Sequence, residues 1–439
     1  MSPHGAVLVV LFVGVLALAV AALFIVPWRT LAAGSPAVPP DVARDFTAAE
    51  QARSRAYHRA ARPTSLASMA VSLLWTLSLG LTTWGADWVS HAGSTLWLQV
   101  ILGLRSLLLA GRLLTLPFAV AGRRLALRVG LAAGSWRTWW LDVLKGTLLS
   151  LALTLVAAGA LLGLARWRPG SWWWWAAAGA AVVVVLLSFI LPVVVEPLFL
   201  RFSPLPDGAV RQDLLDLARR DGVVVADVLV ADASRRTTAL NAYVSGFGPT
   251  RRVVLFDTLL EQAPPAQTRL VVAHELGHVV NRDVVVGTVF AAVGVALTVL
   301  LLSLALSWTW LLDRAGAAGP SDPAVLPLVL ALGVLLGIVT APAQSLVSRR
   351  VEARADVHAL DLAAGSDPAD AARTYARMHK RLAVTNLADL VPNPLRYLWF
   401  ASHPSTARRI ALIRSWASLR GATVPDLATA TDASSDGTD

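Results

Sequence analysis

Residues 172–198 read WWWWAAAGAAVVVVLLSFILPVVVEPL and contain one charged side chain, Glu196, close to their end. A helix needs roughly 20 apolar residues to cross the hydrocarbon core of a bilayer. Six further stretches are long and apolar enough to do so, near residues 5–27, 64–84, 96–121, 147–168, 284–312 and 323–347. The sequence therefore predicts a mainly α-helical, multi-pass membrane protein with seven spans.

The composition supports this prediction. Of the 439 residues, 56% are apolar and only 15% are charged, whereas a soluble domain carries about 25% charged residues. The chain has no cysteine, which excludes disulfides and thiolate metal ligands. Its formal net charge is +10. Because membrane proteins concentrate Lys and Arg on the cytoplasmic side, we attribute this charge to topology and expect no nucleic-acid partner.

The basic residues are unevenly distributed over the connections between the predicted spans. The Arg-rich connections are 28–63, 122–146, 199–283 and the chain after residue 347. The connections 85–95 and 313–322 together contain a single Lys or Arg residue, Arg314. This alternation predicts an external N-terminus and a cytoplasmic C-terminus. The stretch 5–27 lacks a preceding basic segment, so we interpret it as a retained anchor rather than a signal peptide.

Two arginines lie inside the third predicted span. Arg105 and Arg112 are seven residues apart and would therefore share one face of a helix. Charges at this depth usually face a protein interior or a water-filled cavity, which is the interpretation we favour. The alternative is a shifted helix in which one of the two side chains extends to the membrane surface.

The predicted spans divide the chain into five segments, and the water-facing domain is split. Residues 1–198 contain spans one to five, and residues 284–347 contain spans six and seven. The two parts of the water-facing domain are 199–283 and 348–420. Residues 421–439 are rich in Ala, Thr and Asp without periodicity, which predicts disorder.

Local patterns predict a small β-sheet and several helices in the water-facing domain. In the first part they indicate a helix over 209–220, a strand over 223–230, and a hairpin joining 238–244 to 252–256. In the second part they indicate helices near 345–363, 368–382 and 404–418.

The sequence His274-Glu275-Leu276-Gly277-His278 carries the sharpest chemical signal. On a helix, two histidines four residues apart lie on one face, and both imidazoles can reach one zinc ion. Glu275 adjoins the first histidine and can act as a general base on a water molecule there. A structural zinc site does not need such a residue, so Glu275 favours an enzyme over a membrane scaffold with a relic metal site.

A catalytic zinc ion needs a third protein ligand, and Glu352 is the best candidate. Asp356 lies one helical turn further and could orient a zinc-bound imidazole. His358 is six residues from Glu352, which turns it to another face of the helix. His278 precedes the sixth predicted span and Glu352 follows the seventh. The sequence thus predicts one Zn²⁺ per chain, close to the cytoplasmic mouth of the helix bundle.

Several separated segments together resemble a known family, over residues 28–420. They are Glu196-Pro197-Leu198-Phe199, Asn241-Ala242-Tyr243, Val254-Leu255-Phe256-Asp257, the motif at 274–278, Glu352–Asp356 and Ser402-His403-Pro404-Ser405. In order and spacing they are similar to the type I CAAX prenyl proteases, integral-membrane zinc metallopeptidases. The bacterial heat-shock membrane proteases are more distantly similar.

The resemblance implies a seven-span helix bundle enclosing a water-filled chamber, with a cytoplasmic zinc-metalloprotease domain. It also implies roles for single residues. These are zinc binding by His274, His278 and Glu352, base catalysis by Glu275, support of the ligands by Asp356, oxyanion stabilisation by His403, and contact with the substrate backbone by Asn241. The strand predicted over 238–244 could bind an extended peptide along its edge.

Other readings remain open. Site-2-type intramembrane proteases also carry a two-histidine motif, but there it lies within an apolar span, whereas here Gln267 and Arg282 flank it. The resemblance implies a peptide or protein substrate, either with a prenylated C-terminus or, in membrane quality control, without one. The chain is poor in lysine, with only Lys145 and Lys380, as in a high-GC bacterium. This composition favours a bacterial plasma membrane over the endoplasmic reticulum, and a protease without prenyl specificity.

Overall fold

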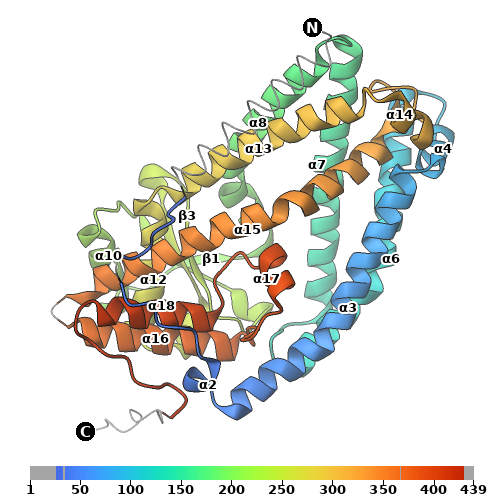
Figure 1. Ribbon diagram of the computed structural model, residues 1–439. Coiled ribbons are helices and arrows are strands. Elements are labelled where there is room, and N and C mark those ends of the chain that lie inside the picture. Colours follow the sequence, from blue (N-terminus) through green and yellow to red (C-terminus); the bar gives the residue numbers. More distant parts are fainter. Residues whose placement is uncertain (1–25, 33–34, 366, 430–439) are drawn as a thin grey trace.

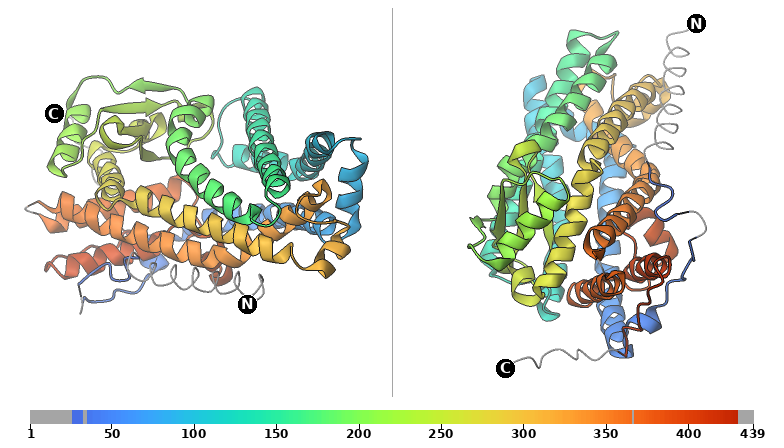
Figure 2. Two further views of the ribbon diagram at one scale, coloured as in Figure 1. Left: turned by 90° about the horizontal axis from the view of Figure 1, so that it is seen from above. Right: turned by 90° about the vertical axis from the view of Figure 1, so that its left-hand side faces the viewer.

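The structure is a computed structural model that describes residues 26–32, 35–365 and 367–429 (Figure 1). Long helices form an elongated bundle, and a sheet with shorter helices forms a second body at one end of it. Figure 2 shows that helices α13 and α15 run side by side along the molecule into this second body. The site described below lies where the two bodies meet.

Among the residues that the structure describes, five helical segments are long and apolar enough to cross a membrane. They are Leu96–Arg128 (α5 Leu96–Leu98, π-helical Gln99–Leu104 and α6 Arg105–Arg128), α7 (Trp136–Trp167), α8 (Trp172–Ile190), α13 (Asp283–Ala305) and Pro323–Ala364. A sixth span results if α3 (Ala48–Gly80) and α4 (Thr83–His91), which are bent by 75°, are counted together. The first predicted span, 5–27, lies outside the described residues. The multi-pass architecture is therefore confirmed, while the number seven stays a prediction.

Two helices extend well beyond the apolar stretches that predicted them. α3 begins at Ala48, where Thr47 and Glu50 form a capping box, so much of the connection 28–63 is helical. α15 (Leu326–Ala364) follows a short 3₁₀ turn at Pro323–Val325 and continues through residue 347 without interruption. The seventh predicted span and the predicted helix 345–363 are thus one rod of 39 residues. The sixth predicted span is shorter than expected, because α13 ends at Ala305 and α14 (Thr309–Ala315) is separate.

The small sheet has four strands in the order β1-β2-β4-β3. They are β1 (Phe202–Pro204), β2 (Asp227–Ala231), β3 (Ala242–Ser245) and β4 (Arg252–Phe256). β2 and β4 are parallel, and the other two pairs are antiparallel. The predicted hairpin is confirmed as β3 and β4, and β3 is an edge strand. The strand predicted from residue 223 begins only at Asp227.

Helices cover the sheet and enclose the largest hydrophobic core. The core helices are α10 (Ala209–Arg220), α12 (Pro265–Val280), α16 (Pro368–Thr385) and α18 (Thr406–Ser418). The remaining short elements are α2 (Val42–Asp45), α9 (Glu196–Phe199), α11 (Asp257–Gln262), α17 (Pro394–Phe400), π-helical Leu191–Val195, and 3₁₀ turns at Ala233–Arg235 and Gly248–Thr250. Trp416 and Tyr375 are the largest fully buried side chains.

The predicted disorder from residue 421 onward is wrong for residues 421–429. Val424 and Leu427 are buried in the main core, and Lys380 Nζ donates a hydrogen bond to the carbonyl of Leu427 at 2.8 Å. The side chains of Val424 and Leu427 thus anchor residues 421–429 to the core, although the composition of this segment alone indicates a solvated tail. Residues 430–439 lie outside the described residues.

The two intramembrane arginines differ in their surroundings. Arg112 lines cavities of about 480 and 640 Å³ between the long helices, as the cavity interpretation predicts. Arg105 is exposed on α6, and the alternative of a side chain that extends to the membrane surface stays a prediction. A single enclosed chamber stays a prediction.

Candidate metal centre

α12 places both histidines of the motif against α15, and Gly277 permits the close approach of the two helices. A Cβ atom at position 277 would lie 3.3 Å from the Cα of Ala355 and 3.1 Å from Cδ2 of His358. These separations are shorter than ordinary van der Waals contact, so a larger residue would push the helices apart. The glycine within the motif therefore brings Glu352 of α15 within reach of the histidines of α12.

His274, His278 and Glu352 converge on one point. One ligand atom from each lies within 4.8 Å of the other two. His274 Nε2 is 3.3 Å from Glu352 Oε2, and His278 Nε2 is 3.6 Å from Glu352 Oε1. Two imidazole nitrogens and one carboxylate form a donor set that suits a catalytic zinc ion with an open coordination position.

The other ring nitrogen of each histidine contacts an aspartate. His274 Nδ1 lies 3.0 Å from Asp356 Oδ1, and His278 Nδ1 lies 2.9 Å from Asp283 Oδ2. Such carboxylates fix the tautomer and orientation of metal-binding imidazoles, leaving Nε2 free for the metal. The sequence analysis identified Asp356 but missed Asp283, although it follows His278 by only five residues. The helix break at Arg282, where φ is 57°, turns the chain so that Asp283 reaches back.

A buried network supports Asp356 and Glu352. Asp356 is fully buried and accepts hydrogen bonds from the Tyr375 hydroxyl at 2.8 Å and from Arg409 Nε at 2.9 Å. Arg409 Nη2 also donates to Glu352 Oε2 at 2.8 Å, so one guanidinium spans both carboxylates. Sequence reasoning missed Tyr375 and Arg409, which no local motif marks, because α16 and α18 bring them to the site from far along the chain.

Burial and these carboxylates act on His274 in opposite directions. Burial lowers the pKa of His274, but its hydrogen bonds to Asp356 and Glu352 outweigh burial and raise the pKa to about 9. His379 lies in the same network, 3.5 Å from Asp356 Oδ1. There burial dominates and lowers the pKa of His379 to about 4. A cation held by His274 must therefore displace a proton at neutral pH.

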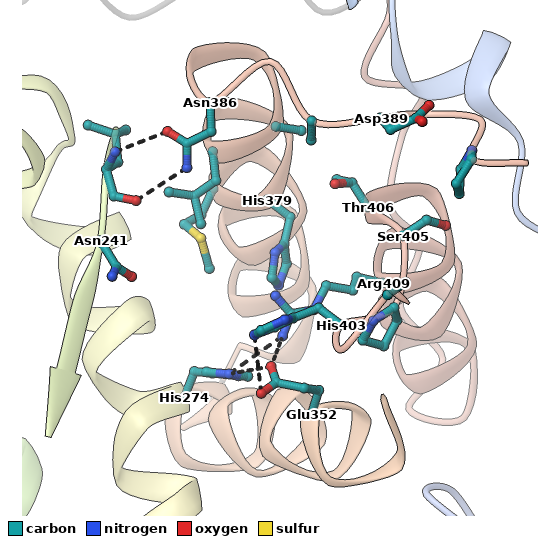
Figure 3. Close-up of a pocket in the computed structure, with 18 of the residues that line it drawn as sticks. Asn241, His274, Glu352, His379, Asn386, Asp389, His403, Ser405, Thr406 and Arg409 are labelled. Atoms are coloured by element: carbon teal, nitrogen blue, oxygen red, sulfur yellow. Dashed lines mark hydrogen bonds and ion pairs between the residues drawn. The ribbon is translucent and has the colours of Figure 1, made fainter. Parts of the chain in front are cut away.

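A cavity of about 510 Å³ opens onto this cluster (Figure 3). Glu275, His403 and Asn241 all line it, together with His274 and Glu352. His403 Nε2 lies 3.3 Å from Glu352 Oε1, and Asn241 projects from the segment that leads into β3. Burial raises the pKa of Glu275, whereas the two neighbouring histidines oppose the shift. The five residues Asn241, His274, Glu275, Glu352 and His403, which the sequence resemblance marks, thus line one cavity. His358, by contrast, contacts Asp221.

α15 also fixes the loop that carries His403. Arg349 Nη1 donates to the carbonyl oxygens of Tyr397 at 2.9 Å and Ala401 at 2.7 Å. One turn earlier, Ser345 Oγ donates to the carbonyl oxygen of Trp399 at 3.0 Å. The helix that supplies Glu352 thereby also positions the segment before His403.

Two family models match consecutive parts of the chain. Residues 27–201 match the family described as CAAX prenyl protease N-terminal, five membrane helices. Residues 204–417 match peptidase family M48. The chain belongs to peptidase family M48.

Individual relatives and a solved structure agree with this assignment. A metalloprotease of Bacillus subtilis, YhfN, is 27% identical over 77% of this chain and 80% of its own length. CAAX prenyl protease 1 of Saccharomyces cerevisiae is 28% identical over 51% of each chain, so the match spans about half of the yeast protein. The crystal structure of S. mikatae Ste24p shares the fold, with a TM-score of 0.72, 22% identity, and coverage of 94% of this chain and 99% of that one.

Membership of M48 identifies the activity. The chain is a multi-pass membrane metalloendopeptidase of the CAAX prenyl protease type, and its substrates are peptides or proteins.

Proposed function

We propose that this M48 peptidase hydrolyses peptide bonds with one zinc ion held by His274, His278 and Glu352. The observation that carries the proposal is the convergence of their ligand atoms within 4.8 Å, in a cavity that also presents Glu275. The contacts of both Nδ1 atoms with aspartates support it, because they direct both Nε2 atoms to the same place.

Bound zinc would supply a Lewis acid that polarises the substrate carbonyl and makes water more acidic. Glu275 accepts the proton of the attacking water and later delivers it to the leaving amine. His403 donates a hydrogen bond to the carbonyl oxygen as negative charge develops there. The contact of Ser402 Oγ with His403 Nδ1, at 2.8 Å, supports this role. A hydroxyl that donates to Nδ1 leaves the ring proton on Nε2, the nitrogen that faces Glu352.

We propose that the substrate lies as an extended strand along the edge of β3. Main-chain pairing positions a scissile carbonyl without demanding a particular sequence. Asn241 precedes β3 and lines the catalytic cavity, so its carboxamide can contact the substrate backbone. In this arrangement the peptide passes between β3 and the metal ligands.

We further propose that the catalytic side faces the cytoplasm of a bacterium and that cleavage does not require a prenyl group. The Arg-rich connections support the orientation, and similarity to a Bacillus metalloprotease over most of both chains supports the source. Mass spectrometry of products from matched prenylated and unprenylated peptides tests the specificity. Equal rates are expected, and cleavage of the prenylated peptide alone would contradict this part of the proposal.

Replacing Glu275 tests the mechanism. Glu275→Gln should retain one zinc ion per chain but lose peptide cleavage, because the amide cannot accept the proton. Glu261→Gln is the matched control, since Glu261 is exposed on α11, and it should cleave at the wild-type rate. A Glu275→Gln protein that cleaves as fast as wild type would rule out the assigned base.

A further inference from the structure

Along the outer edge of β3, every second residue directs its backbone N–H and C=O groups outward, where a bound peptide could pair with them. Backbone groups of successive residues in a strand point to opposite sides. The Phe256 amide donates to the carbonyl of Asn241 at 3.0 Å, so Asn241 faces β4 inside the sheet. Leu240, Ala242 and Val244 therefore direct their N–H and C=O groups to the opposite edge, away from β4.

Asn386 occupies one end of this edge. Its Oδ1 accepts a hydrogen bond from the amide of Leu240 at 3.0 Å, and its Nδ2 donates to the carbonyl of Leu240 at 3.3 Å (Figure 3). A carboxamide presents C=O and N–H side by side, as one residue of a neighbouring strand does in a hydrogen-bonded pair. The side chain of Asn386 thus takes the place that one residue of a bound peptide would take.

The chain around Asn386 is firmly attached to its neighbours. Asn386 caps the C-terminus of α16, and the next residue, Leu387, adopts the left-handed conformation with φ of 47°. The carbonyl of Leu387 contacts His58 Nε2 at 2.8 Å, and the carbonyl of Ala388 accepts from Ser54 Oγ at 2.7 Å. α3 therefore holds this turn in place, and Asn386 forms a fixed stop at the edge.

Beyond this stop the edge is also occupied. The amide of Thr238 donates to the carbonyl of Leu131 at 3.3 Å, and its hydroxyl donates to the carbonyl of Gly130 at 2.6 Å. Within β3 itself, the two described residues that face this edge, Ala242 and Val244, have no backbone hydrogen bond there.

We propose that Asn386 ends the substrate-binding edge and thereby selects the peptide bond that is cut. A peptide can pair with Ala242 and Val244 but not with Leu240, so its register against His274 and Glu352 is fixed. Without the carboxamide, Leu240 becomes a third pairing position. Because strand pairing repeats every two residues, the peptide can then shift by two residues. Asn386 is a positioning residue, and this inference rests on the proposed peptidase and on pairing along β3.

The first test uses the wild-type, zinc-loaded protein and a peptide that it cuts at one bond. Each backbone amide of the peptide is replaced in turn by an ester, which removes one N–H donor. Two replacements, two residues apart, should lower kcat/KM by about 3- to 10-fold, the usual effect of one hydrogen bond. The ester two residues further toward Asn386 should have no effect.

The second test compares Asn386→Ala with wild type on the same peptides. Products displaced by two residues should appear, and the third ester position should become sensitive. Asn393→Ala is the matched control, because Asn393 caps α17 in the same loop without touching β3. The control should give the wild-type products only.

Each outcome decides the inference. Two sensitive ester positions and displaced products support it. Three sensitive positions in wild type, or an Asn386→Ala protein that cuts only the original bond, overturn it while leaving the peptidase assignment intact. No ester sensitivity refutes pairing along β3 and the inference with it. Absence of cleavage by wild type refutes the proposed function itself. Should Asn386→Ala fail to fold, the wild-type ester scan still decides between two and three positions.

Discussion

His278 and Asp283 lie on different helices, yet Nδ1 of His278 is 2.9 Å from Oδ2 of Asp283. Asp283 is the first residue of α13, a candidate membrane span, and Arg354 of α15 also contacts its carboxylate. The first residue of a candidate span thus contacts a side chain of the candidate metal centre. The start of this span therefore sets the orientation of His278, one of the proposed ligands.

Replacing Asp283 should weaken metal binding. Asp283→Asn keeps the shape of the side chain but removes the charge that orients His278, and loss of such a partner typically costs about 10- to 100-fold in metal affinity. Competition with a zinc chelator measures the change. Asp221→Asn is the matched control, because Asp221 makes the same kind of contact, at 2.9 Å, with His358, which is not a proposed ligand. Equal affinities in the two variants would contradict the orienting role.

Arg349 should affect catalysis without affecting metal binding. It holds the carbonyls of Tyr397 and Ala401 ahead of His403 and touches none of the proposed ligands. Arg349→Met should lower kcat by roughly 10- to 100-fold, since small displacements of a catalytic group have effects of this size. Arg350→Met is the neighbouring control, because the Arg350 guanidinium lies over the ring of Trp28 and donates to the Trp28 carbonyl instead of to the loop before His403. A zinc affinity that falls together with kcat would show that Arg349 acts on the ligands instead.

Gly277→Ala should separate the two helices of the metal centre. The added methyl group would lie 3.3 Å from the Cα of Ala355, which is backbone and cannot rotate away. Overpacking of this kind costs about 1 to 3 kcal/mol of stability, and here it also moves the histidines away from Glu352. Gly287→Ala in α13 is the control, because nothing lies within 4 Å of the place that its methyl group would take. Thermal unfolding and zinc titration of both variants check the prediction, and an unchanged Gly277→Ala protein would refute it.

Local sequence spacing predicts the features whose residues lie close together in the chain. The histidines at 274 and 278 and the pair Glu352 and Asp356 are each four residues apart on one helix, so helical geometry alone places them together. The β3–β4 hairpin follows from a short Gly-rich turn in the same way. By contrast, Arg409 and Tyr375 come from α18 and α16, and only tertiary packing brings them to Asp356.

Hydropathy also predicts the wrong end for a helix that extends beyond its apolar segment. α15 contains a membrane-like half and a polar half with Glu352, and the helix continues from one to the other in spite of Pro342, which lacks a backbone N–H. The apolar pattern indicates which part of a helix can contact lipid. The backbone hydrogen bonds of the helix continue beyond that part until a capping residue ends them. For this reason one continuous helix, rather than a linker, joins the apolar part of the chain to the part that carries Glu352.

The last prediction concerns acid stability and His379. This side chain is buried, and burial, followed by the nearby Arg409, lowers its pKa to about 4 against about 6.5 in an unfolded chain. Above pH 6.5 both states are neutral. As the pH falls from 6.5 to 4, the unfolded state takes up a proton that the folded state does not, so stability is lost.

Between pH 7.5 and 5 this single histidine should cost about 2 kcal/mol of stability. His379→Gln cannot bind the proton, so its stability should fall less over the same interval. Urea unfolding of both proteins in detergent, after treatment with a chelator, measures the difference without a contribution from metal release. If wild type and His379→Gln lose the same free energy of unfolding between these two pH values, the buried imidazole does not set the acid limit, and other groups of the network must be titrating in its place.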